Sequence, residues 1–247
     1  MGKLIVNADD FAYTEAISLG IIKAFTEGII TSTTVMANMP SFDRAVQLAK
    51  EHPSLAVGVH LNITTYKPIL TDVPSLVKED GTFHYLDFYE QDGVVSKDDV
   101  YREWKAQIER VIHAGIKPSH LDSHHHINTA SQVRDVFIEL AREFKLPVRN
   151  NFAVPADIKT TGSFMNFDQF AHQRKLWKPL LVKEMLDKLT KCGSLEFMCH
   201  PGYVDYELMH LSGLNINRTD TLHEAVNPFY KKLLIDNDHA LVTFNDI

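Results

Sequence analysis

Three consecutive histidines, His124–His126, lie in the segment HLDSHHHINTA at residues 120–130. Histidine is the commonest metal ligand in proteins and titrates near neutral pH. If the segment is a strand, its side chains alternate, so that Asp122, His124 and His126 share one face and His125 points away. Asp122 could then accept a hydrogen bond from a histidine and hold it in one tautomer. The segment predicts a pair of inward-facing imidazoles, and a surface cluster of histidines is the alternative.

Polar residues also end three other apolar segments. Asp9 and Asp10 follow KLIVNA, His60 follows VGV, and His200 follows EFMC. Two adjacent carboxylates repel each other unless a cation relieves the repulsion. Each signal has an ordinary alternative: a helix cap for the aspartates, a buried hydrogen-bonded histidine for His60, and a turn-stabilising histidine for His200. Taken together, a carboxylate pair and imidazoles from three segments have the composition of an open divalent metal site.

Other catalytic patterns are missing from the sequence. It contains no G-x-S-x-G elbow for a nucleophilic serine, no P-loop and no G-x-G-x-x-G loop. Cys199 directly precedes His200, but neighbouring strand residues point to opposite sides, which makes Cys199 a poor nucleophile candidate. Metal-assisted chemistry is therefore the reading that the residue types favour.

The composition excludes several classes of function. The chain has 247 residues, 45% of them hydrophobic, and a net charge of −7, which argues against binding a nucleic-acid backbone. No apolar run approaches the ~20 residues of a membrane span, and the apolar part of the first ten residues is too short for a signal peptide. Two cysteines, Cys192 and Cys199, fit a reducing compartment, and a single disulfide between them is the alternative. We expect one cytoplasmic domain over residues 1–247, with no nucleic-acid or membrane partner.

Apolar runs of strand length alternate with amphipathic segments of helical length. Ser41 and the SKDD segment at 96–99 are expected to cap helices, residues 63–95 to form a long loop, and residues 152–178 to be irregular. The expected strands cover residues 3–10, 31–37, 55–62, 119–126, 146–151, 194–201 and 240–246. The expected helices cover residues 13–27, 41–52, 96–114, 130–144, 178–191 and 221–237, the last interrupted at Pro228.

This alternation predicts a mostly parallel sheet. The strands are apolar through their length, as strands covered on both faces should be. An open doubly wound sheet and a closed barrel both fit that pattern. The polar residues end four different strands, however, and a barrel brings all its strand ends to one rim. We therefore expect an α/β fold, a distorted TIM-like (β/α) barrel of about seven parallel strands.

Five segments resemble the YdjC-type carbohydrate deacetylases, and among them the chitooligosaccharide (chitin disaccharide) deacetylases most closely. In chain order they are NADDF (7–11), GIITSTTVMANMP (28–40), PSLAVGVHLNIT (53–64), KPSHLDSHHH (117–126) and EFMCHP (196–201). The resemblance implies a barrel of the glycoside hydrolase/deacetylase kind, and an enzyme that hydrolyses the amide of an N-acetylated sugar. It also implies a homodimer and a divalent metal, usually Mg²⁺.

The resemblance also assigns roles to residues of this chain. It implies that Asp9 is the general base and His200 the general acid, and that the metal ligands are Asp10, His60 and His124. One carboxylate and two imidazoles would equally suit Zn²⁺, Mn²⁺ or Co²⁺, so Mg²⁺ depends on the resemblance alone.

Two further residues are candidates for the substrate site. His126 is expected to face the same pocket as His124. Arg149 lies near the end of the expected strand 146–151, where it could hold Asp9 ionised or be an ordinary surface arginine. The chain departs from the family at Ala12, where a glycine usually follows DDF, and after His126, where a further histidine and often a proline are usual. These departures lie on the expected substrate wall and bear on which sugar is bound.

Two other functions are compatible with the residues. A metal-dependent phosphoesterase can use a similar barrel, but such sites usually gather more histidines and two or three metals. A non-catalytic sugar-binding protein could retain the fold, but it would have no need of a paired base and acid.

Overall fold

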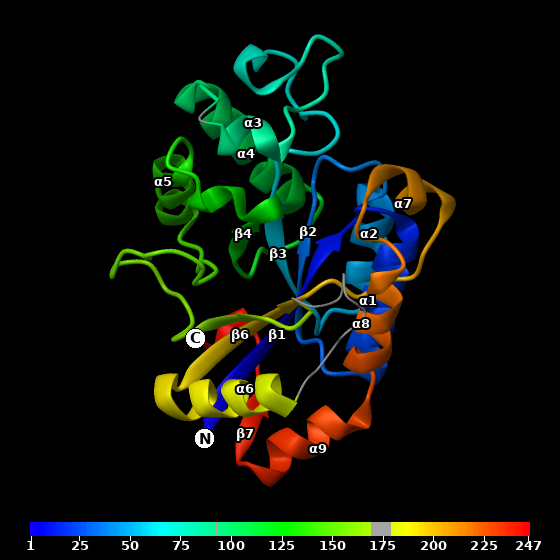
Figure 1. Ribbon diagram of the computed structural model, residues 1–247. Coiled ribbons are helices and arrows are strands. Elements are labelled where there is room, and N and C mark those ends of the chain that lie inside the picture. The colour runs from blue at the N-terminus through cyan, green and yellow to red at the C-terminus, as the bar shows by residue number, and fades with distance from the viewer. Residues whose placement is uncertain (92, 169–178) are drawn as a thin grey trace.

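The computed structural model describes residues 1–91, 93–168 and 179–247, and the side chains of residues 179–181 are not described. Within this part of the chain, parallel strands form one sheet in the order β4-β3-β2-β1-β6-β5, and β7 also pairs with β1 (Figure 1). The strands are β1 (Gly2–Phe11), β2 (Ser32–Val35), β3 (Ala56–Leu61), β4 (Leu121–Ser123), β5 (Phe164–Asn166), β6 (Ser194–Cys199) and β7 (His239–Leu241). The curved sheet with surrounding helices is a half-barrel, which confirms the predicted distorted (β/α) barrel.

Strand β1 is the centre of the sheet. Its residues Lys3–Ala8 pair with β6, its first residues pair with β7, and its carboxyl half pairs with β2. On the other side, β3 pairs with β4 so that His60 lies opposite Asp122. Because all these strands run in the same direction, their carboxyl ends meet at one rim.

Helices surround the sheet, with α1, α7 and α8 on one side in the view of Figure 1 and α3, α4 and α5 on the other. Thr14 caps α1 by accepting a hydrogen bond from the Ile17 amide, and Ser96 caps α4 through the Asp99 amide. The helices are α1 (Glu15–Glu27), α2 (Phe42–Glu51), α3 (Leu86–Glu90), α4 (Lys97–His113), α5 (Arg134–Phe144), α6 (Pro179–Cys192), α7 (Tyr206–Leu211), α8 (Asn217–Ala225) and α9 (Pro228–Asp236). Short 3₁₀ turns are η1 (Pro74–Leu76), η2 (His124–Thr129) and η4 (Phe244–Asp246).

Several sequence expectations need correction. The expected strand 146–151 forms only one bridge, between Leu121 and Val148, and β5 lies instead in a stretch that was expected to be irregular. The final strand ends at Leu241 and gives way to η4. Ser41 precedes α2 but makes no side-chain capping bond. The expected break at Pro228 is confirmed, because α8 and α9 are separate helices.

The expected long loop 63–95 contains η1 and α3 and is anchored on α4. The Glu103 carboxylate accepts hydrogen bonds from the Ile69 and Leu70 amides, and Asp99 accepts from Ser75. Residue 92 of this loop, residues 169–178 of the irregular stretch and hence the first residue of the expected helix 178–191 lie outside the described residues. No described helix has the length and apolar character that crossing a membrane would require.

Candidate active site

Asp10 lies near the end of β1, and its backbone has a positive φ of 72°. A non-glycine residue in this region is strained, and such strain often accompanies functional sites. The Asp10 Oδ1 atom is buried and has no hydrogen-bond partner among the described residues, although His124 Nδ1 lies 3.0 Å and His60 Nε2 3.4 Å from it. An unpaired carboxylate oxygen between two imidazole nitrogens is the arrangement that a cation would complete.

His60 is oriented by its neighbour on β4. Its Nδ1 atom lies 2.7 Å from Asp122 Oδ1, so its Nε2 atom is turned toward Asp10. Burial lowers the pKa of His60, but Asp122 and Asp10 raise it to about 10 in the absence of a cation. The carboxylate that fixes the histidine tautomer is Asp122, the residue that strand alternation had indicated.

The histidine run adopts a backbone that the sequence did not predict. Strand β4 ends at Ser123, and His125 and His126 have φ values of 55° and 52°, inside the turn η2. Strand alternation therefore does not apply beyond Ser123. The expectation that His125 points away is wrong, because its ring centroid lies 3.9 Å from that of His124, with the two rings tilted, and its Nδ1 atom lies 3.0 Å from Thr64 Oγ1.

Together, Asp10, His60 and His124 offer three ligand atoms that all lie within 4.8 Å of one another. All three residues are buried, and burial holds the pKa of His124 below its usual value although Asp10 opposes this. A neutral imidazole is the form that binds a metal. The orphaned Oδ1 atom and this donor set fit a divalent metal.

Asp9 is held by Arg149 from the segment that follows α5. Arg149 Nη1 lies 2.8 Å from Asp9 Oδ2, and Nη2 lies 2.7 Å from Asp9 Oδ1. Burial would raise the pKa of Asp9, but the paired guanidinium holds it well below its usual range. Arg149 is fully buried and also contacts Asp122 and Glu196, so the surface-arginine alternative is wrong.

His200 follows β6 and is held by Asp168. The Asp168 carboxylate accepts the His200 backbone N–H at 2.7 Å, and its Oδ1 atom lies 3.2 Å from His200 Nδ1. Burial lowers the pKa of the imidazole, but Asp168 more than offsets this and the pKa is raised. The side chain is still 20% exposed, so a molecule at the rim can reach it.

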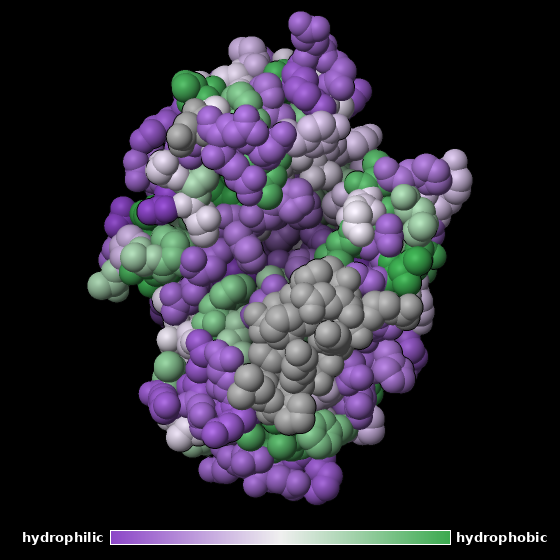
Figure 2. All heavy atoms as spheres, in the orientation of Figure 1, coloured by the Kyte–Doolittle hydropathy of each residue, from purple (hydrophilic) through white to green (hydrophobic). Residues whose placement is uncertain are grey.

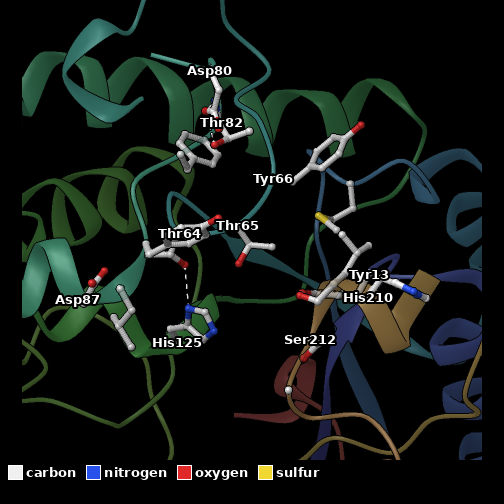
Figure 3. Close-up of a pocket in the computed structure, with 16 residues that line it drawn as sticks. Tyr13, Thr64, Thr65, Tyr66, Asp80, Thr82, Asp87, His125, His210 and Ser212 are labelled. Carbon is white, nitrogen blue, oxygen red and sulfur yellow. Dashed lines mark hydrogen bonds between the residues drawn. The ribbon is translucent and has the colours of Figure 1, made fainter. Parts of the chain in front are cut away.

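A cavity of about 700 Å³ is lined by two neighbours of His124, Tyr13 and His125 (Figure 3), and Figure 2 shows a hydrophilic hollow at the centre of this face of the molecule. Tyr13 and His125 line it from different sides, and Tyr66 is a further lining residue (Figure 3). Both Tyr13 and His125 make ring contacts with His124, at 5.8 and 3.9 Å. His126 lines a neighbouring cavity of about 340 Å³, beside Asn151 and Phe164 rather than beside His124. The two cavities share His125 as a wall.

Sequence reasoning missed three charged residues of the site. Asp168 lies in a stretch without hydrophobic period, and Glu196 is a buried acid inside an apolar strand that contacts Arg149. Arg218 of α8 contacts Asp10 Oδ2 at 2.6 Å, across 208 residues of sequence. The acid in β6 was a visible signal, because a charged residue is rarely buried unless it is paired. No local pattern marked Asp168 or Arg218.

The chain has clear relatives. The family described as YdjC-like protein matches residues 3–227. A carbohydrate deacetylase of Clostridium beijerinckii is 36% identical over 99% of this chain and 100% of its own length. One of Oceanobacillus iheyensis is 40% identical, over 86% of this chain and 91% of its own.

Solved structures agree with this match. An Enterococcus faecalis protein, whose name associates it with cellobiose-phosphate cleavage, is 31% identical with a TM-score of 0.90, over 99% of this chain and 98% of its own. The family 4 carbohydrate esterase of Streptomyces lividans, solved in complex with acetate, has a TM-score of 0.53 at 10% identity, over 97% of this chain and 91% of its own, which shows a shared fold. From the match over residues 3–227 and the full-length relatives, the chain belongs to the YdjC-like family.

Proposed function

We propose that this protein is a metal-dependent carbohydrate deacetylase that removes the acetyl group from an N-acetylated sugar and releases acetate. The observation that carries the proposal is the buried group Asp10, His60 and His124 with an arginine-held carboxylate and an aspartate-held imidazole beside it. The names of the full-length relatives support the same chemistry.

Amide hydrolysis needs a base for water and an acid for the departing amine. Asp9 is the candidate base, because its position beside Asp10 is fixed by Arg149 and it is kept ionised. A strongly ionised carboxylate is a weak base, so its contribution depends on water that is already activated. When bound, a divalent metal would supply that activation and polarise the acetyl carbonyl.

His200 is the candidate acid. Burial lowers its pKa, but Asp168 more than offsets this, and the raised pKa favours the protonated imidazole that an acid must have. It is partly exposed, whereas Asp9 is 2% exposed, which leaves the imidazole accessible to a leaving amine. An acid and a base whose environments push their pKa values apart are the pairing that this reaction requires.

Two arguments bear on the identity of the metal, and they favour different ions. Resemblance to the family favours Mg²⁺. Two imidazoles and one carboxylate oxygen are the donors that Zn²⁺, Co²⁺ and Mn²⁺ accept more readily than Mg²⁺ does. We propose a single divalent ion and include all four metals in the test below.

The phosphoesterase alternative would need a second metal, and the neighbouring group of Asp9, His60 and Asp122 is the place where one could bind. These residues also offer three close ligand atoms. However, Arg149 Nη2 lies 2.7 Å from both Asp9 Oδ1 and Asp122 Oδ2, so a guanidinium already occupies the position of a second cation. One metal per chain is therefore expected, not two or three.

The test is acetate release from N-acetylglucosamine, its 6-phosphate and N,N′-diacetylchitobiose, each with Mg²⁺, Zn²⁺, Co²⁺ and Mn²⁺ added to metal-free protein. At least one pair of sugar and metal should release acetate. Asp9→Asn should keep bound metal and lose about 10²–10⁴-fold in kcat, because the amide cannot accept a proton. His60→Ala should lose the metal. Activity in Asp9→Asn within a few-fold of wild type would remove Asp9 from the base role.

A further inference from the structure

Arg218 is a buried cation that the proposed reaction does not use. It is 2% exposed and lies in α8, outside the five short segments by which the sequence resembles the family. Its Nη2 atom lies 2.6 Å from Asp10 Oδ2, and its Nε atom donates to the Leu214 carbonyl oxygen at 2.8 Å. Its Nη1 atom is buried without a hydrogen-bond partner in the described part of the chain.

The two buried arginines of the site differ in how their charge is balanced. Arg149 contacts three carboxylates, those of Asp9, Asp122 and Glu196. For Arg218, the one ion pair found among the described residues is with Asp10. The positive charge of Arg218 is therefore directed at the single carboxylate of the candidate metal group. Consistently, burial would raise the pKa of Asp10, but Arg218 and His124 hold it well below its usual value.

The contact also divides the two oxygens of Asp10 between two partners. Arg218 occupies Oδ2, and Oδ1 faces His60 and His124. A cation held by this group would then have Oδ1 of Asp10 available to it, while Oδ2 would stay paired with Arg218. The donors available to it are the imidazoles of His60 and His124 and one carboxylate whose charge an arginine already offsets.

We propose that Arg218 is a positioning residue that restricts Asp10 to one-oxygen coordination and keeps the bound metal weakly held and strongly electrophilic. This inference rests on the proposed metal site. A positive charge one carboxylate away repels a divalent cation, and even at a high effective dielectric this changes affinity by at least about tenfold. Less charge donated to the cation leaves it a stronger Lewis acid.

Two substitutions separate the charge of Arg218 from its packing. Arg218→Gln keeps a donor for Asp10 but removes the charge, and Arg218→Lys keeps the charge. Zn²⁺ is titrated calorimetrically into the metal-free proteins. We expect Arg218→Gln to bind Zn²⁺ at least about tenfold more tightly than wild type, with a lower kcat. Arg218→Lys should stay within about threefold of wild type in affinity, because the charge that repels the cation is kept.

Arg142→Gln is the matched control, because Arg142 forms an exposed ion pair with Asp157 and should leave the Zn²⁺ affinity unchanged. Unchanged or weaker Zn²⁺ binding by Arg218→Gln would overturn the proposal, and so would equal affinities of the glutamine and lysine variants. His60→Ala is measured alongside. If it still binds Zn²⁺ like wild type, the metal site itself is wrong, whereas its loss of binding confines any failure to the role of Arg218.

Discussion

At the scale of single residues, the turn that carries His125 changes what that residue is expected to do. Its backbone lies in the left-handed region, which places its ring against His124 and in the wall shared by both cavities. We expect His125→Ala to raise KM about tenfold or more, because the variant would lose a polar contact to the sugar. The metal should stay bound, since His125 is not one of its proposed ligands. Steady-state kinetics and metal analysis of the same preparation check this. A variant that loses metal would make His125 part of the metal group, and unchanged kinetics would remove it from the substrate wall.

Asp168 offers a test of the acid that does not remove the acid. Because Asp168 raises the pKa of His200, Asp168→Asn should lower it. A general acid works only below its pKa, so the alkaline limb of the kcat profile should move to lower pH in the variant. The profile is measured from pH 5.5 to 10 on both proteins with the same metal. An alkaline limb that stays in place would mean that another group sets it and would separate His200 from the acid role.

At the scale of elements, the sequence predicted the part of the candidate site that depends on local sequence pattern and on the direction of the strands. Asp10, His60 and His200 follow apolar runs of strand length, and parallel strands bring such ends together. The turn after Ser123 could not be predicted, because no sequence pattern indicates that His125 and His126 adopt left-handed backbone conformations. Arg218 and Asp168 reach the site from segments whose position is decided by tertiary packing. The hydrophobic periodicity of the sequence gives no information about such packing.

The contact between α1 and the segment after β6 shows how elements hold His200 in place. A Cβ atom on Gly20 of α1 would lie 2.6 Å from Gly202 Cα, two residues beyond His200. Alanine normally stabilises a helix relative to glycine, but here the collision should win, because overpacking costs about 1–3 kcal/mol. We expect Gly20→Ala to lower the free energy of unfolding and to reduce kcat, as measured by urea denaturation and steady-state kinetics.

Gly213→Ala is the control for stability, since a Cβ atom on Gly213 meets no described atom within 4 Å. Its free energy of unfolding should stay within about 0.5 kcal/mol of wild type. If both variants unfold at the same urea concentration, α1 does not press on this segment as tightly as the structure has it.

At the scale of the whole molecule, the two ends of the barrel carry different kinds of histidine. At the carboxyl-terminal rim, the histidines are paired with carboxylates: His60 with Asp10 and Asp122, and His200 with Asp168. Toward the other end, His120 directly precedes β4, and its ring stacks at 3.6 Å on Phe244 of the carboxyl-terminal turn η4. Its ring also excludes any side chain at residue 58, where a Cβ atom would lie 2.5 Å from it. One histidine thus joins β3, β4 and the end of the chain.

This placement makes the stability of the protein depend on pH. Burial lowers the pKa of His120 to about 3, whereas an unfolded chain has a histidine pKa of about 6.5. The unfolded state therefore binds the proton first, so the stability that neutral His120 contributes is complete above pH ~6.5 and is lost as pH falls toward 3. Between pH 7.5 and 5 the loss of stability from this residue should be about 2 kcal/mol.

His120→Phe, which cannot titrate, should show a correspondingly smaller decrease in the free energy of unfolding between the two pH values. Urea denaturation of both metal-free proteins at pH 7.5 and 5 measures the difference, and the other histidines cancel because both proteins contain them. Equal decreases in the two proteins would show that His120 becomes protonated in the folded state without cost.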